Sequence, residues 1–211
     1  MNRISKLVRV AAISTSIVSL GGCALMDVAS EPAPRFFTLT PPALQVAEAP
    51  TPVQLAVNEF TTSAALDTSR IVYQPSEKEI KYYAGARWAD QAPAMIRELM
   101  VRTLEKSGAF AAVVRDGSQV RADYALSGEI RRFAAMPGSG EGKRVEVVLL
   151  ARLIENKTSR IVGTQEFSGM VTSTDGRMDN VVGAYNAALG DALSKLSVWA
   201  VETLRTTKPV S

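Results

Sequence analysis

The spacing of hydrophobic residues changes twice along this chain, from every second position to a helical repeat. Between positions 143 and 155 an apolar residue stands at every second position from Val145 to Leu153, with Val148 and Leu150 on the opposite face. Asn156–Ser159 turns this segment back into a second one at 160–172. Alternation with a period of two is typical of a β-strand, so the sequence predicts a long antiparallel hairpin here. Shorter segments of the same kind predict further strands at 35–39, 53–60, 70–74, 80–83, 110–114 and 124–133.

The last of these shorter segments also predicts which side chains share a face. Successive side chains of a strand point to opposite sides of the sheet. We therefore expect one side of this strand to carry Tyr124, Leu126, Gly128, Ile130 and Arg132.

Two segments have helical spacing instead. Apolar residues form a stripe along 90–107, and a longer stripe lies within 179–206. Asp90 and Asp179 are suitable N-caps for these helices, and Gly108 favours the end of the first one. The order strands, helix, strands, helix predicts a single α+β domain with a mostly antiparallel sheet and two main helices packed on one face.

The chain begins with a different pattern. Arg3, Lys6 and Arg9 are followed by the uncharged apolar run Val10–Leu20 and by two glycines. A charged opening, a short apolar middle and small residues are typical of a secretory signal peptide. The run is too short to cross a hydrocarbon core about 30 Å thick, which needs roughly 20 residues. The sequence therefore predicts that residues 1–22 direct export and are removed.

The segment Leu20-Gly-Gly-Cys23 resembles the lipobox of bacterial lipoproteins. That resemblance implies cleavage between Gly22 and Cys23 and acylation of Cys23. Cys23 is the only cysteine of the chain, and an exported unpaired thiol is otherwise a liability. The alternative is a periplasmic protein whose cysteine lies beside the cut by chance. Two or three acyl chains would hold the protein on a membrane without a spanning helix.

These patterns together divide the chain into four parts. We expect a lipoprotein signal peptide at 1–22, a lipidated tether at 23–34, the α+β domain at 35–206 and a C-terminal tail at 207–211. The chain has 24 basic and 21 acidic residues, and the three basic residues of the predicted signal account for the whole excess. The mature protein is then formally neutral, so its charge gives no argument for binding nucleic acid.

The residue types available narrow the chemistry. Histidine is absent from the sequence, which removes the usual general base and the commonest metal ligand. If Cys23 carries lipid, thiolate metal sites and disulfides are excluded as well. We therefore expect a binding or structural protein and not an enzyme, with no cofactor and no metal apart from the covalent lipid on Cys23. The rival in this respect is an exported hydrolase that works with carboxylates alone.

One segment before the first helix is rich in aromatic residues. Tyr82-Tyr-Ala-Gly-Ala-Arg-Trp88 holds three aromatic rings and Arg87. One interpretation is a hydrophobic staple that seats the helix, with Arg87 stacked on a ring or paired with a carboxylate. The other is a partner-contact surface of Tyr82, Tyr83, Arg87 and Trp88, because Tyr, Trp and Arg are enriched at interface hot spots. The sequence leaves both open.

The same segment, followed by Pro93 and a helix that ends in Leu104-Glu-Lys-Ser-Gly-Ala-Phe110, resembles the ABC-type transport auxiliary lipoprotein family. The lipobox, an early strand near Phe37-Thr-Leu39 and the order of the later elements agree with it. The resemblance implies an auxiliary component of an intermembrane lipid transport system that has no catalytic residues. Its implied partner is a mammalian-cell-entry-domain protein of a lipid ABC transporter.

The resemblance also implies a location. Retention in the inner membrane typically needs Asp directly after the lipidated cysteine, whereas this chain has Ala24 there. The expected place is therefore the periplasmic face of the outer membrane, with the acyl chains as the anchor. Self-association into a homo-oligomer stays open. The alternative function is an assembly lipoprotein of another envelope machine, for lipopolysaccharide or outer-membrane protein insertion.

Overall fold

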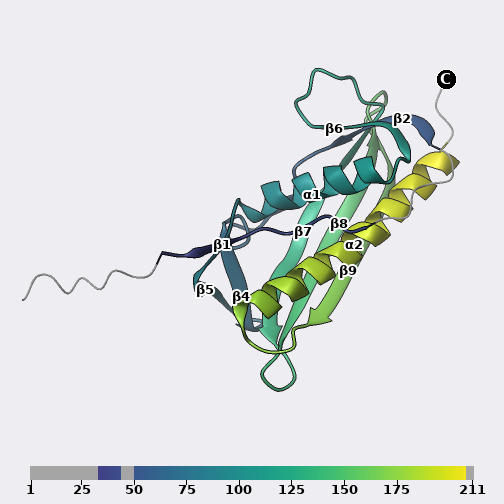
Figure 1. The fold of residues 1–211 in the computed structure, drawn as a ribbon. Coiled ribbons are helices and arrows are strands. Elements are labelled where there is room, and N and C mark those ends of the chain that lie inside the picture. The colour runs from purple at the N-terminus through teal and green to yellow at the C-terminus, as the bar shows by residue number, and fades with distance from the viewer. Residues whose placement is uncertain (1–32, 44–49, 208–211) are drawn as a thin grey trace, which may run out of the picture. The chain divides into compact units, whose positions relative to one another are not determined.

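Two helices cover one face of a nine-stranded sheet in this computed structural model, which describes residues 33–43 and 50–207 (Figure 1). The predicted α+β class is confirmed. The elements are β1 (Arg35–Phe37), β2 (Thr51–Val57), β3 (Thr61–Thr62), β4 (Arg70–Ser76), β5 (Glu79–Trp88), α1 (Ala92–Lys106), β6 (Phe110–Arg115), β7 (Tyr124–Pro137), β8 (Lys143–Glu155), β9 (Arg160–Thr172) and α2 (Met178–Thr206).

The long strand β7 organises the sheet. One edge of β7 pairs with β8 along almost its whole length, and β8 pairs with β9; both pairings are antiparallel. The predicted hairpin at 143–172 is therefore confirmed with its predicted bounds. Since these two pairings join most of the paired residues, the sheet is mostly antiparallel, as the sequence predicts.

The opposite edge of β7 is shared by three short strands in succession. β2 pairs with β7 at Tyr124–Leu126, β3 at Glu129–Ile130 and β4 at Ala135, all in parallel. β1 also runs parallel to β5, and β2 parallel to β6. The sequence does not predict these parallel neighbours, because alternation identifies a strand but not the strand beside it.

Helices and sheet enclose a core whose sheet side is formed by alternate residues. Val145, Val147, Leu149 and Leu153 of β8 are fully buried. α2 packs mainly on β9 and β8, while α1 lies over β6 and β2 and also touches α2. Neither α1 nor α2, within the part of the chain described here, is long and apolar enough to cross a membrane.

A bulge in β7 corrects one sequence prediction. The pairing with β8 shifts between Ile130 and Arg132, so that Ile130 faces Leu149 but Arg132 faces Val148. Arg132 therefore lies on the face opposite Ile130, where its Nη1 is 2.7 Å from a carboxylate oxygen of Glu146. The expectation that Arg132 shares a side with Ile130 is wrong, because one extra residue reverses the alternation.

The predicted N-caps are also corrected. Gln91 and Arg177 are the N-cap residues, and neither makes a side-chain cap hydrogen bond. The carboxylate of Asp90 instead accepts a hydrogen bond from the neighbouring Gln91 amide, 2.7 Å away. Asp179 lies inside the first turn of α2, where a negative charge suits the helix dipole. The predicted end of α1 is confirmed, since Gly108 follows the C-cap with a φ of 61°.

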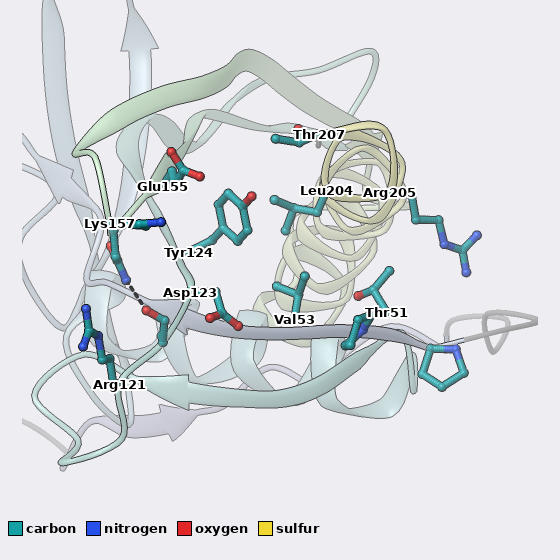
Figure 2. A pocket seen from close by; sticks show the side chains of 14 residues that line it. Thr51, Val53, Arg121, Asp123, Tyr124, Glu155, Lys157, Leu204, Arg205 and Thr207 are labelled. Carbon is teal, nitrogen blue, oxygen red and sulfur yellow. Dashed lines mark hydrogen bonds between the residues drawn. The ribbon is translucent and has the colours of Figure 1, made fainter. Parts of the chain in front are cut away.

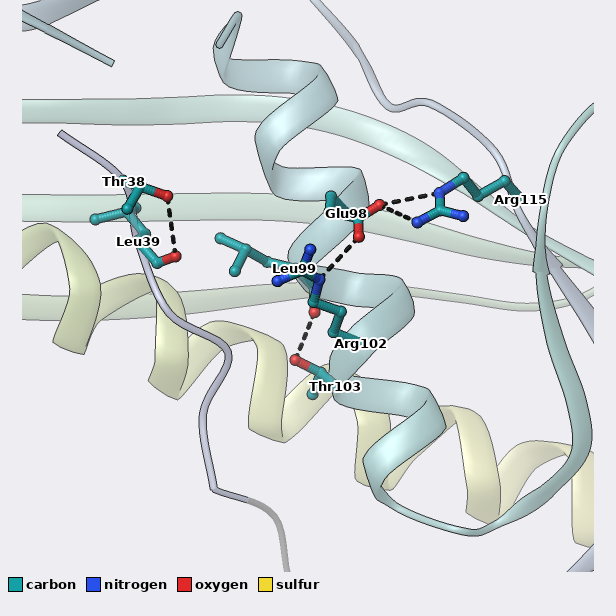
Figure 3. Close-up of polar contacts among 7 residues, drawn as sticks. All are labelled: Thr38, Leu39, Glu98, Leu99, Arg102, Thr103 and Arg115. Atoms are coloured by element: carbon teal, nitrogen blue, oxygen red, sulfur yellow. Dashed lines mark hydrogen bonds and ion pairs between the residues drawn. The ribbon is translucent and has the colours of Figure 1, made fainter. Parts of the chain in front are cut away.

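A carboxylate on α1 ties that helix to the edge of the sheet (Figure 3). Glu98 accepts a hydrogen bond from Arg102 of the same helix at 2.8 Å and from Nη2 of Arg115, the last residue of β6, at 2.5 Å. These bonds from Arg115 and Arg102 hold the pKa of Glu98 below its ordinary value. Glu98 thus connects α1 to the end of β6.

Candidate functional site

The predicted lipidation site lies outside the described residues. Gly22 and Cys23 precede residue 33, so cleavage and acylation stay predictions. What the structure does describe is how the chain after the predicted tether enters the fold.

This entry segment is strapped to α2. Arg35 donates hydrogen bonds to both carboxylate oxygens of Asp179, at 2.6 and 3.4 Å. The amide of Thr40 donates to the side-chain oxygen of Asn186 at 2.7 Å, and Leu39 is buried in the core. The chain that follows the tether is therefore held against α2 at two points about two helical turns apart.

Trp88, one of the four predicted contact residues, belongs to the core. Its side chain is 1% exposed, and its ring centroid lies 5.6 Å from that of Phe133 and 5.1 Å from that of Tyr185. The Tyr185 hydroxyl donates to the carbonyl of Val72 at 2.6 Å. A side chain buried in this way presents no atoms to a partner, so the structure removes Trp88 from the contact surface. Its burial agrees with the staple interpretation in that Trp88 packs inside the fold.

Tyr83 is half-buried in the same strand. Its ring lies 5.7 Å from that of Tyr73, and its hydroxyl is buried without a hydrogen-bond partner among the described residues. Burial, together with the neighbouring Tyr73, raises the pKa of Tyr83 to about 12. This hydroxyl therefore carries a desolvation cost that no contact in the described fold offsets.

Arg87 is exposed and Tyr82 is half-buried, and strand pairing places two further side chains beside them. Arg87 of β5 is in register with Phe36 of β1 on one side and with Arg70 of β4 on the other. The Arg70 guanidinium lies 3.6 Å from the ring centroid of Tyr82, and Phe36 is 65% exposed. We call Phe36, Arg70, Tyr82 and Arg87 the cation–aromatic row.

The sequence identifies two members of this row and misses the others. Phe36 and Arg70 are distant in sequence from Tyr82, and only the pairing of β1 and β4 with β5 brings them together. The predicted stacking of Arg87 on a ring is made instead by Arg70. A usable signal lies in Arg35-Phe-Phe37, because alternation in a strand sends one of two adjacent phenylalanines outward.

A cavity of about 750 Å³ opens at the C-terminal end of α2 (Figure 2). Its walls come from the start of β2, the turn before β7, the turn after β8 and the last turn of α2. Val53, Tyr124 and Leu204 form an apolar side, and Figure 2 shows Tyr124 between these side chains and Glu155. Arg121, Asp123, Lys157 and Arg205 add charged groups to its lining. No pattern in the sequence indicates this site, because its walls come from four separate segments.

Two polar side chains of this cavity are almost completely buried. Tyr124 is 5% exposed, and its hydroxyl makes no hydrogen bond within residues 33–43 and 50–207. Glu155 is 6% exposed; one carboxylate oxygen accepts a hydrogen bond from Thr158 at 2.5 Å. Burial, with the carboxylates of Glu155 and Asp123 nearby, raises the pKa of Tyr124.

Hydrogen bonds from both backbone and side chains connect the cavity walls. The amide of Asp123 donates to the carbonyl of Gln54, and its carboxylate accepts from the Gln54 amide at 2.8 Å. Asn156 donates twice to the facing turn, from its backbone amide to Asp123 and from its side-chain amide to Ala122, each at 2.9 Å. The site is therefore largely formed before any ligand enters, as is common for small-molecule sites.

Comparison with known proteins places the chain. The family model of the ABC-type transport auxiliary lipoprotein component matches residues 37–196. The crystal structure of protein XCC0632 from Xanthomonas campestris has a TM-score of 0.74 and 27% identity, over 81% of this chain and 97% of that one. A second crystal structure, of an uncharacterized protein, has a TM-score of 0.57 at 15% identity, over 82% and 99%, and shows a shared fold.

A longer relative matches as well. An uncharacterized protein of Bradyrhizobium diazoefficiens is 29% identical over 167 residues, which are 77% of this chain and 43% of that protein. The chain therefore spans less than half the length of this relative. The family model, in contrast, covers well over half of the chain, from the first strand to the second half of α2. On these grounds the chain belongs to the family of ABC-type transport auxiliary lipoprotein components.

Proposed function

We propose that this protein is a lipid-anchored auxiliary component of an ABC-type system that moves lipids between the inner and outer membranes. The family match carries the proposal. The lipobox ending at Cys23 supplies the anchor, and Ala24 in place of Asp favours the periplasmic face of the outer membrane. Arg35 lies twelve positions after Cys23, a stretch that spans at most about 40 Å when extended, so β1 would stay close to the bilayer.

The protein partner in this proposal is a mammalian-cell-entry-domain protein of the transporter, and the cation–aromatic row is its contact surface. The row has three exposed members, combines the residue types of interface hot spots and includes β1, the strand that follows the tether. Arg87 occupies its centre, between Phe36 and Arg70. A partner held near the membrane would meet this face of the sheet, while the opposite face is covered by the helices.

Three measurements on the full chain in its native host test the proposal. Mass spectrometry of the mature protein should show an acylated Cys23, and density-gradient separation should place it with the outer membrane. Affinity purification should recover the transporter's mammalian-cell-entry-domain protein. Arg87→Glu should reduce that recovery, whereas Arg160→Glu, an exposed arginine on β9, should leave it unchanged.

Each of these measurements can contradict a different part of the proposed function. An unacylated Cys23 would remove the anchor, and fractionation with the inner membrane would overturn the location. Recovery of lipopolysaccharide or outer-membrane protein insertion machinery would support the alternative function in place of lipid transport. Normal recovery with Arg87→Glu would move the contact away from the cation–aromatic row.

A further inference from the structure

The cavity of Figure 2 has no part in anchoring or in the proposed partner contact, and its chemistry points to a ligand. We propose that it binds one amphiphilic molecule whose head carries a protonated amine beside a phosphate, as in an ethanolamine phospholipid. The choice of a membrane lipid as the source rests on the proposed lipid-transport function. The amphiphilic character of the ligand follows from the cavity itself.

The apolar side of the cavity suits a hydrocarbon chain. Val53, Leu204 and the ring of Tyr124 face the cavity, and Pro50 and Pro52 extend this wall along β2. A volume of about 750 Å³ lies within the usual range of roughly 300–1,000 Å³ for ligand sites. Apolar surface of this kind gains free energy when a chain displaces water from it.

The buried polar side suits an ammonium group. Glu155 is 6% exposed, and within the described residues Thr158 bonds to one of its two carboxylate oxygens. The hydroxyl of Tyr124, on a residue 5% exposed, adds an acceptor with no partner among the described residues. A buried carboxylate is costly unless it is paired with a cation and hydrogen-bonded. An ammonium group provides both, since it has three donors and a positive charge.

A guanidinium at the edge of the cavity is suited to bind a phosphate. Arg121 lies in the turn before β7, among the residues that line the cavity, and is exposed. A guanidinium binds phosphate oxygens through two parallel donors. A purely cationic ligand would be repelled by Arg121, Lys157 and Arg205, which all line the cavity, and a purely anionic one by Glu155 and Asp123. A head that carries both charges avoids both costs.

The test uses the acylated full chain in phosphatidylcholine nanodiscs. Native mass spectrometry counts the probe molecules that stay on the released protein, for lauroyl lysophosphatidylethanolamine, for lauroyl lysophosphatidylglycerol, which has the same chain without the amine, and for phosphoethanolamine, which has no chain. We expect one lysophosphatidylethanolamine per protein at saturation, weaker retention of the glycerol lipid and no retention of phosphoethanolamine.

Variants assign the binding to the cavity. Glu155→Gln keeps the shape and an acceptor for Thr158 but removes the charge, so it should weaken retention of lysophosphatidylethanolamine about tenfold, the effect of roughly 1.4 kcal/mol. Tyr124→Phe removes a hydroxyl that no described residue binds, so folding should be unaffected while retention falls. Glu141→Gln, an exposed loop carboxylate, is the matched control and should change nothing.

Several outcomes would overturn the inference. Equal retention of the two lipids would exclude recognition of the amine, and retention of phosphoethanolamine would indicate a site for a soluble head and not for an amphiphile. Unchanged retention in both Glu155→Gln and Tyr124→Phe would place the lipid elsewhere. Partner recovery by the wild type and by Glu155→Gln separates this test from the proposed function. Recovery by both, with unchanged lipid retention, overturns this inference alone. No recovery by either, with the expected lipid retention, overturns the proposed function alone.

Discussion

Arg35 donates two hydrogen bonds to the carboxylate of Asp179, which lies 144 positions later in the chain. Arg35 is the first residue of β1, and Asp179 lies in the first turn of α2. The hydrogen bond from Arg35 is the main reason that the pKa of Asp179 is lowered. The pair therefore joins the chain that enters from the tether to the longest helix of the described fold.

Acid should release this pair. A carboxyl whose pKa is lower in the folded state stabilises the fold above its ordinary value, near 3.8, and loses that contribution as the pH falls through the folded pKa. Arg35→Ala should have the same local effect at neutral pH. The amide of Ala89, which donates to the carbonyl of Phe37, should then exchange faster, as measured by hydrogen–deuterium exchange. Because both side chains are exposed, the unfolding temperature should hardly change. Equal exchange in Arg160→Ala and Arg35→Ala would contradict a specific role.

Trp88 and Arg87 are adjacent residues with separable roles. Trp88→Ala should lower the free energy of unfolding by about 3–5 kcal/mol, because it opens a cavity against Phe133 and Tyr185. Arg87→Ala, at an exposed position, should stay within about 0.5 kcal/mol of the wild type. Urea denaturation gives both values. Loss of partner recovery with Trp88→Ala at a temperature where the variant is folded would contradict the assignment of this side chain to the core.

Alkaline pH should destabilise the fold through Tyr83. A pKa raised from 10.0 to about 12 favours the neutral phenol in the folded state. The contribution of this phenol to the free energy of unfolding is then complete below about pH 10 and falls as the pH rises towards 12. Tyr83→Phe should remove part of that slope. At neutral pH it should leave the free energy of unfolding unchanged or raise it by about 1 kcal/mol, because the hydroxyl that it removes is buried and has no partner among the described residues. A destabilised Tyr83→Phe at pH 7 would show that the hydroxyl has a favourable contact.

Two glycines should respond in opposite directions to alanine. A Cβ at Gly169 of β9 would overlap the carbonyl oxygen of Ala188 on α2, so Gly169→Ala should cost at least about 1–3 kcal/mol. Gly183 is an exposed position of α2 where a Cβ would meet no other atom within 4 Å, and Gly183→Ala should stabilise by about 0.5–1 kcal/mol. Chemical denaturation of both variants is sufficient. Equal free energies of unfolding for the two variants would mean that β9 and α2 can move apart to admit the Cβ of residue 169 without destabilising the fold.

The sequence predicts elements better than it predicts their neighbours. The bounds of β8 and β9 follow from the apolar residues at every second position of β8 and from the short turn after it, and the apolar stripes of α1 and α2 are buried as expected. The N-caps expected at Asp90 and Asp179 are wrong, because each carboxylate has a competing local or distant partner. The expected face of Arg132 is wrong because a bulge leaves no sign in the residue types alone.

The candidate sites show the same limit. Tyr82 and Arg87 can be singled out from one segment, yet Phe36 and Arg70 join them only through pairing with β5. The cavity at Tyr124 and Glu155 needs four segments to meet, and buried polar residues in strands look like ordinary outward positions in a sequence. Contacts between distant segments are set by packing, which a single sequence does not display.

Because of the bulge at Arg131, β7 should tolerate the deletion of a residue at some positions and not at others. Before the bulge, Leu126, Gly128 and Ile130 face the helices, and after it Phe133 and Ala135 do. Phe133 therefore follows Ile130 by three positions, where a regular strand would have two. Losing Arg131 would restore simple alternation and keep Phe133 inside. Losing any residue between Leu126 and Ile130 would instead bring the preceding half of the strand out of phase with the half that follows. Evolutionary deletions in this strand should therefore collect at the bulge, at the expense of the ion pair from Arg131 to Glu166.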